Sequence, residues 1–89
     1  MEFSFSTELA RDLKKIKQKQ PQLFKKIQKQ LKLFKEDVKH PSLRTHKLKG
    51  SLFNTWSISI EGNVRLIYAI KNKEAIFFKI GNHDKVYRK

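Results

Sequence analysis

The sequence predicts an α+β domain: an N-terminal strand, an antiparallel helix hairpin, and a three-stranded antiparallel meander forming one sheet packed on the helices. Three observations favour this class. Apolar residues in the first half recur at three- and four-residue steps, the period of an amphipathic helix. In the second half they alternate with polar residues, the period of a half-buried strand. The turns between the alternating segments are short, which is typical of a meander.

The chain is long enough for one compact domain over residues 1–89, with one modest core. It contains no cysteine, which excludes disulfides and thiolate metal sites. Its histidines are scattered and its acids are few, so we expect no metal ion and no cofactor. No signal peptide or membrane span is recognisable, so we expect a cytoplasmic location and no membrane partner.

The first half is predicted to hold one strand and two helices. Phe3 and Phe5 alternate with polar residues and predict a short strand. Ser6 or Thr7 can cap the helix that follows, because a hydroxyl accepts from a free backbone amide. Its apolar face consists of Leu9, Leu13 and Ile16. Pro21 suits the first turn of a second helix, whose apolar stripe consists of Phe24, Ile27, Leu31 and Phe34.

The second half is predicted to be a basic connection over residues 37–50 and then three strands, 55–60, 64–70 and 76–80. The apolar face of the last strand is expected to be Ile76, Phe78 and Ile80. An antiparallel sheet can leave one face in water. We expect the helices to cover one face and the opposite face to stay open. The residues expected on that open face are Ser57, Ser59, Arg65, Phe77 and Lys79.

The charge of the chain is strongly one-sided. Lysine and arginine total 21 against 8 acidic residues, a formal net charge of +13. This excess predicts a polyanionic partner, and nucleic acid comes first. A general abundance of surface lysine is the plainer alternative. The two basic amphipathic helices could also lie on a membrane, but the strands need covering, which favours burial in a core.

Three segments carry a resemblance to a known family. Residues 46–50 with Trp56 resemble the pattern H-x-L-x-G…W, residues 64–68 resemble R-[LI]-[IV]-Y, and residues 80–87 are similar to IGxHDxVY. Together, and in this order, they resemble the RelE/ParE superfamily of toxin–antitoxin toxins, closest to its YafQ-like and YoeB-like ribonuclease branch. The resemblance covers essentially the whole chain and implies a RelE-like fold.

The resemblance implies a ribosome-associated endoribonuclease that cleaves messenger RNA without a metal and is held inactive by an acidic or amphipathic antitoxin. The expected partners are therefore an antitoxin protein, messenger RNA and the ribosome. In this chemistry the ribose 2′-OH attacks the neighbouring phosphate and the 5′-oxygen leaves. The reaction needs a base, an acid and fixed cations that stabilise the charge on the phosphorane.

The resemblance places four side chains in catalytic roles. His83 matches the family's C-terminal histidine and is the expected general acid. His46 is the first choice for general base. Arg65 is always charged and can bind phosphate through two N–H groups. Tyr87 could hold the phosphate, stack on a base or help protonate. The residues expected to bind RNA or phosphate are Arg44, Lys47, Lys49, Lys79 and Lys85.

Two departures leave the identity of the base open. At Ser59 the relatives often carry His or Arg, and at Asn63 the YafQ-like branch has an acid. Glu61, on the nearby turn, is a possible substitute base. Arg65 lies mid-strand between apolar neighbours, where an idle charge is costly. It is expected either to pair with an acid such as Glu61 or, the favoured reading, to bind phosphate.

Two other functions stay open. The first is a gyrase-poisoning toxin of the ParE kind, which shares the fold but binds a protein. Such relatives generally lack the C-terminal histidine and tyrosine that this chain has at His83 and Tyr87. The second is a non-catalytic RNA-binding protein or a decayed toxin, which the unfilled roles at Ser59 and Asn63 would fit.

Overall fold

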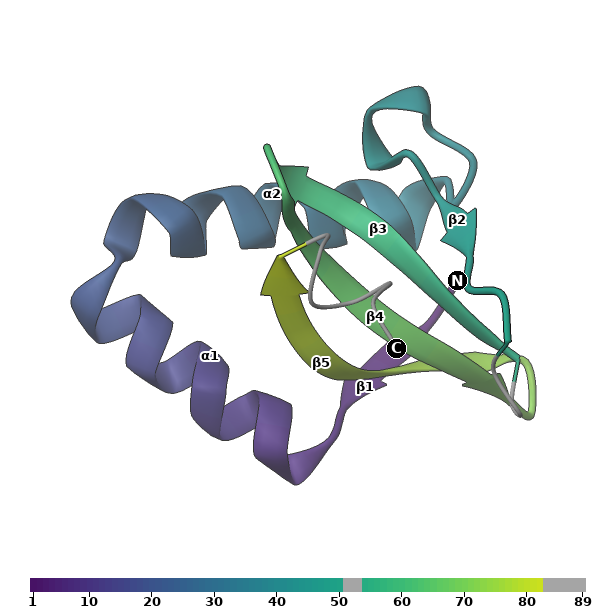
Figure 1. The fold of residues 1–89 in the computed structure, drawn as a ribbon, viewed down its shortest axis with the longest axis horizontal. Helices are drawn as coiled ribbons and strands as arrows, with labels where there is room; N and C mark the ends of the chain where they lie inside the picture. Colours follow the sequence, from purple (N-terminus) through teal and green to yellow (C-terminus); the bar gives the residue numbers. More distant parts are fainter. Residues whose placement is uncertain (51–53, 83–89) are drawn as a thin grey trace.

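The computed structural model describes residues 1–50 and 54–82. The elements are β1 (Phe3–Phe5), α1 (Thr7–Lys19), α2 (Pro21–Glu36), the 3-10 helix η1 (Pro41–Leu43), β2 (His46–Lys47), β3 (Thr55–Glu61), β4 (Val64–Lys71) and β5 (Glu74–Asn82). The strands form one sheet in the order β1-β5-β4-β3-β2. Both helices lie on one side of this sheet, and α2 passes behind it in Figure 1. The predicted α+β class is confirmed.

The sheet is wider than the predicted three-stranded meander. Strand β1 pairs in parallel with β5, and β2 adds a further edge beside β3. The segment 37–50 was expected to be a connection without strands, and this was wrong for His46 and Lys47. Two polar residues are too few to show a period of alternation, so their pairing with β3 leaves no signal in the sequence.

The helices begin where the capping residues predict. Ser6, rather than Thr7, caps α1, since its Oγ accepts the amide of Leu9 at 3.1 Å. Gln20 alone separates the two helices, and Pro21 occupies the first position of α2. The predicted apolar faces are confirmed: the helix residues buried in the core are Leu9, Leu13, Ile27, Leu31 and Phe34.

An aromatic cluster forms the centre of the core between α2 and the sheet. The ring of Phe34 lies 4.9 Å from that of Tyr68 and 5.1 Å from that of Phe77, centroid to centroid. The rings of Tyr68 and Phe77 are 5.0 Å apart. Edge-to-face and tilted contacts at such distances are favourable between aromatic rings. Burial raises the pKa of Tyr68 to about 12, because the phenolate would lose its hydration.

Strand β5 corrects the predicted alternation. Phe77 is fully buried and Phe78 is 38% exposed, the reverse of what was expected. A bulge is the reason, because the register passes from Ile67 with Lys79 to Tyr68 with Phe77. Phe78 is the extra residue, and it changes which side the following side chains face. Ile80 therefore packs against the core as predicted, whereas Ile76 and Phe78 do not belong to it.

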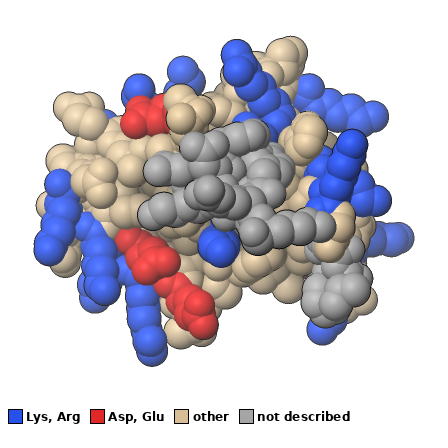
Figure 2. All heavy atoms as spheres, viewed as in Figure 1, with Lys and Arg blue, Asp and Glu red and all other residues tan. Residues whose placement is uncertain are grey.

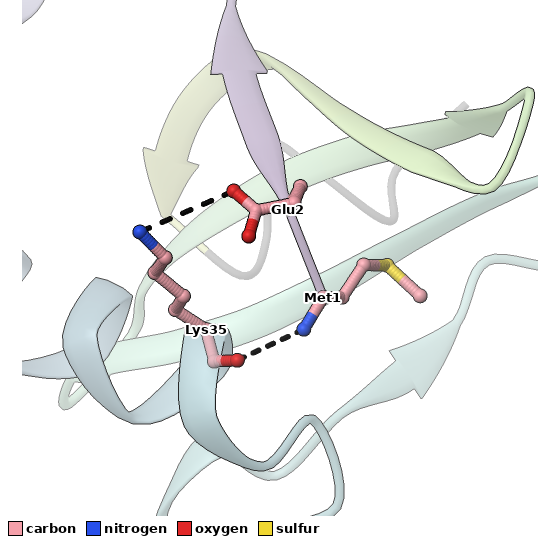
Figure 3. A network of polar contacts seen from close by, with 3 residues as sticks. All are labelled: Met1, Glu2 and Lys35. Carbon is pink, nitrogen blue, oxygen red and sulfur yellow. Dashed lines mark hydrogen bonds and ion pairs between the residues drawn. The ribbon is translucent and has the colours of Figure 1, made fainter.

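The start of β1 is tied to the end of α2 (Figure 3). The nitrogen of Met1 donates to the carbonyl oxygen of Lys35 at 2.9 Å, and Glu2 Oε1 lies 4.0 Å from Lys35 Nζ. The carbonyl of Glu2 accepts the amide of Ala75 from β5. A cation at the C-terminal end of a helix also faces the negative end of the helix dipole. These contacts fix β1 between α2 and β5.

Candidate functional site

The candidate site lies on the sheet face that points away from the helices, the face seen in Figure 1. Directly opposed residues of neighbouring strands put their side chains on the same face. His46 opposes Ser57, Ser57 opposes Ile67, and Ile67 opposes Lys79. A row of four side chains therefore crosses the sheet from β2 to β5. Arg65, two residues before Ile67 on β4, shares this face.

Arg65 lies flat on the sheet and points towards β2. Its Nε donates to Ser57 Oγ at 2.9 Å, and its Nη2 donates to the carbonyl oxygen of Arg44 at 2.6 Å. A longer contact of 3.4 Å joins Nη2 to the Ser57 carbonyl. These bonds fix the plane and direction of the guanidinium. A cation held rigidly in this way is suited to bind an anion at a defined position.

Arg44 offers its carbonyl to Arg65 because of an unusual backbone conformation. It ends η1 with φ 44° and ψ 51°, in the left-handed region, which is uncommon for residues other than glycine. The hydroxyl of Thr45 donates to the carbonyl of Val38 at 2.9 Å and closes the same connection. The segment before β2 thus holds the Arg65 side chain in place, in addition to connecting η1 to β2.

The prediction that this face stays open was wrong at its centre. Arg65 is only 8% exposed, and Ser57 and Ile67 are buried too. The two polar members of this buried centre are hydrogen-bonded to each other through Arg65 Nε and Ser57 Oγ. The outer positions of the face fit the expectation, since His46 and Lys79 are exposed.

The charge of Arg65 has no carboxylate partner among the described residues. Its acceptors there are a hydroxyl and two backbone carbonyls, all of them neutral. The alternative in which Arg65 pairs with Glu61 is wrong, because Glu61 Oε1 lies 2.7 Å from Lys26 Nζ. A buried cation costs free energy unless an opposite charge or several hydrogen bonds compensate it. A bound phosphate would provide that opposite charge.

Glu61 faces away from Arg65 because β3 carries a bulge. Ser59 opposes Arg65 but Glu61 opposes Val64, so Ile60 is an extra residue. The extra residue reverses the alternation and turns Glu61 towards α2, where it meets Lys26. The structure therefore does not bring Glu61 together with Arg65 and His46, as a substitute base would require.

The predicted RNA-binding cations are divided between two faces. Lys79 and His46 lie in the row on the Arg65 face. Lys47 follows His46 on β2 and points to the other face, where its Nζ lies 5.7 Å from the centre of the Trp56 ring. Lys49 is exposed in the turn after β2. His83, Tyr87 and Lys85 lie outside the described residues.

Sequence reasoning missed three contributors to the site. Ser57 was expected on this face but was given no role, although the register alone puts it near Arg65. The Arg44 carbonyl belongs to the backbone and leaves no sequence signal. Gln30 is a buried polar residue in α2. Its position inside the apolar stripe, three residues after Ile27, is a signal that could have been used.

The periphery of the face seen in Figure 2 is mostly basic. Figure 2 shows lysine and arginine side chains around the periphery of the view and acidic side chains in small patches. A surface dominated by one sign of charge concentrates and steers partners of the opposite sign. Among the described residues, no helix is long and apolar enough to cross a membrane.

A groove lies on the helix side of the molecule, on the face opposite Arg65. Its volume is about 520 Å³. Its floor is apolar and is formed mainly by Phe5, Leu13, Phe24, Ile27 and Leu31. Its basic lining residues are Lys14, Lys17 and Lys32. An apolar floor with lysines at its border is suited to an acidic amphipathic segment.

Solved structures with the same architecture are toxins of toxin–antitoxin systems. The chain is similar to the YoeB dimer from Staphylococcus aureus, with a TM-score of 0.76 and 24% identity over 93% of this chain and 97% of that one. It is similar to the YoeB/ParE toxin from Agrobacterium tumefaciens, with a TM-score of 0.78 and 16% identity over 93% and 99%. At these identities the likeness concerns the fold, which is that of the RelE/ParE toxins.

The E. coli DinJ–YafQ toxin–antitoxin complex is a further match, with a TM-score of 0.75 and 22% identity over 97% of this chain and 96% of that one. A search of curated protein sequences finds no significant match. The family model described as "Bacterial toxin of type II toxin-antitoxin system, YafQ" matches residues 1–88. The chain therefore belongs to the YafQ family of type II toxin–antitoxin toxins.

Proposed function

We propose that this toxin is an endoribonuclease that cuts messenger RNA on the ribosome, in the cytoplasm, without a metal ion. The observation that carries the proposal is Arg65, a buried guanidinium whose acceptors among the described residues are all neutral. The scissile phosphate would neutralise it. Because the guanidinium is already oriented by Ser57 and Arg44, binding needs little reorganisation at the moment of reaction.

The proposed reaction is an attack of the ribose 2′-oxygen on the adjacent phosphorus. His46 takes the 2′ proton as general base, and His83 gives a proton to the leaving 5′-oxygen as general acid. The products are a 2′,3′-cyclic phosphate and a free 5′-hydroxyl. Arg65 stabilises the charge on the phosphorane, and Tyr87 contacts the phosphate or a base. His46 supports this assignment by its place beside Ser57, the residue that receives Arg65 Nε.

The other cations are proposed to hold the RNA backbone. Lys79 stands on the Arg65 face, and the remaining members of the set are Arg44, Lys47, Lys49 and Lys85. Each phosphate contact releases counterions. The logarithm of the binding constant should therefore fall linearly with the logarithm of the salt concentration. Lys47, on the other face of β2, is expected to contact a different part of the RNA from Lys79.

The test is primer extension on a translated message, with induced wild-type protein and single variants. We expect Arg65→Ala, His46→Ala and His83→Ala each to lower cleavage at least about a hundredfold, as loss of a positioned acid, base or charge does. Arg65→Lys keeps the charge but loses the fork of two donors and should also be impaired. The control is Arg11→Ala, which removes the same charge from an exposed position on α1.

The outcomes separate this function from the alternatives. Codon-spaced cleavage by the wild type and the Arg11 variant, lost in the Arg65 variant, supports the ribonuclease. Growth arrest with intact transcripts and inhibited supercoiling in vitro would assign the ParE-like activity instead. Salt-sensitive RNA binding without cleavage would leave an RNA-binding or decayed toxin. Retained cleavage in all three site variants would remove His46, Arg65 and His83 from the mechanism.

The partner that neutralises the toxin is proposed to be an antitoxin with an acidic amphipathic segment. The groove between the helices fits such a segment, because its floor is apolar and its lining includes lysines. The net charge of +13 adds a long-range attraction. The groove and Arg65 lie on opposite sides of the sheet, so this contact alone leaves the arginine face uncovered.

A pair of charge reversals on one helix tests the antitoxin contact. Lys32 lines the groove and Lys29 does not, although both are exposed on α2. Lys32→Glu should weaken binding of the antitoxin by about tenfold, since an attraction becomes a repulsion of similar size. Lys29→Glu makes the same change in net charge and should have a smaller effect. Calorimetry measures both, and equal losses would place the segment elsewhere.

A further inference from the structure

Gln30 is a polar residue on the buried, apolar face of an amphipathic helix. It lies on α2 inside the apolar stripe formed by Ile27, Leu31 and Phe34, and it is only 7% exposed. A buried amide costs free energy unless its donors and acceptor find partners, whereas an apolar side chain of the same length needs none. The amide therefore needs a reason to be there.

The amide nitrogen of Gln30 joins two segments that border the candidate site. Its Nε2 donates to the carbonyl of Ser42 in η1 at 3.1 Å and to the carbonyl of Ser59 in β3 at 2.8 Å. An amide nitrogen carries two hydrogens, so these bonds use its full donor capacity. Gln30 thus links three elements, α2, η1 and β3, at one point.

Both linked carbonyls belong to segments that hold Arg65. Ser59 directly opposes Arg65 in the pairing of β3 with β4. Ser42 lies two residues before Arg44, whose carbonyl accepts Arg65 Nη2 at 2.6 Å. The amide of Gln30 therefore sets the position of the acceptor at the tip of the guanidinium relative to the strand beneath it.

We propose that Gln30 is a positioning residue for Arg65: by fixing η1 against β3, it places the Arg44 carbonyl and so aims the guanidinium at the scissile phosphate. The inference rests on the proposed ribonuclease function. Gln30 itself touches neither RNA nor the reacting atoms. Its loss should misplace a charge that acts in the transition state, and a misplacement of about 1 Å can cost about a hundredfold in rate.

The test compares Gln30→Met, which keeps the length and removes both donors, with Ile27→Val, which loosens the same helix without touching a hydrogen bond. Cleavage is measured on translating ribosomes. Gln30→Met should lower kcat about ten- to a hundredfold with little change in KM, because the interaction lost is made in the transition state. Ile27→Val should keep kcat within about twofold of wild type. If Gln30→Met does not fold, Gln30→Asn, which retracts the amide by one methylene, replaces it.

Two further readouts separate positioning from general loosening. In an Arg65→Ala background, Gln30→Met should have no further effect on kcat, since residues acting through one group are not additive. In nuclear magnetic resonance spectra, the Arg65 Nε–Hε signal should exchange slowly with water in the wild type and faster in Gln30→Met. Unchanged exchange, additive losses, or equal kcat in Gln30→Met and Ile27→Val would each overturn the inference. If the proposed ribonuclease function itself is wrong, the result is different, because the wild-type protein then does not cut RNA.

Discussion

The alkaline titration of Tyr68 offers a quantitative test of the aromatic core. The side chain is 2% exposed and packs against the rings of Phe34 and Phe77. Burial raises its pKa to about 12, from an ordinary value of about 10. The folded protein therefore keeps the phenolic proton over a range in which the unfolded chain has already lost it.

The sign and size of the effect follow from this difference. Below pH 10 the hydroxyl is protonated in both the folded and the unfolded state, so the ionisation of Tyr68 does not lower the free energy of unfolding. As the pH rises from 10 to 12, ionisation favours the unfolded chain, and the free energy of unfolding falls. One pKa unit corresponds to about 1.4 kcal/mol, so the shift of Tyr68 predicts a loss of about 3 kcal/mol across this window.

The assay is chemical unfolding at a series of pH values between 9 and 12, with the wild type and Tyr68→Phe side by side. The many lysines titrate in the same range, but they are common to both proteins and cancel in the difference. The wild type should lose about 3 kcal/mol more than Tyr68→Phe over the window. Parallel curves would refute the reasoning, because they would mean that the hydroxyl of Tyr68 ionises as easily in the core as in water.

Two further predictions test the register of β5 and the support of the arginine. Phe77→Ala should cost about 3–5 kcal/mol in unfolding free energy, as truncation of a buried aromatic does, whereas Phe78→Ala, at the exposed bulge position, should stay within about 1 kcal/mol. The opposite ranking in thermal unfolding would contradict the bulge. Ser57→Ala removes the acceptor of Arg65 Nε and should cost about 1–3 kcal/mol, with a loss of cleavage larger than that of Ser59→Ala; equal activity would show that Ser57 does not support Arg65.

The helices and the two central strands could be predicted because their signals are local. The stripe of α2 and the alternation from Trp56 to Tyr68 repeat often enough to define a face. In residues 75–78 every side chain is apolar, so alternation cannot choose between Phe77 and Phe78. The bulge at Phe78 determines which of the two faces the core, and the apolar run does not mark its position.

The candidate site was predictable in its residue types but not in its contacts. Arg65 stands out as a charge within an apolar strand and lies on the predicted face, but its burial there was not predicted. Its acceptor at Arg44 is a backbone carbonyl of a residue in the left-handed conformation. The pattern of side chains does not predict such a contact. Glu61 was considered as a base because it lies on the turn close to Ser59 and Asn63, but one extra residue in β3 turns it towards α2.

The parallel pairing of β1 with β5 has a consequence for synthesis. Residues 3–5 hydrogen-bond beside residues 75–77, so β1 cannot pair until β5, which is synthesised much later, is available. Contacts so distant in sequence are slow to close and form only after most of the chain is available. A nascent toxin therefore cannot complete its sheet, or its core around Phe77, while most of β5 is still inside the exit tunnel.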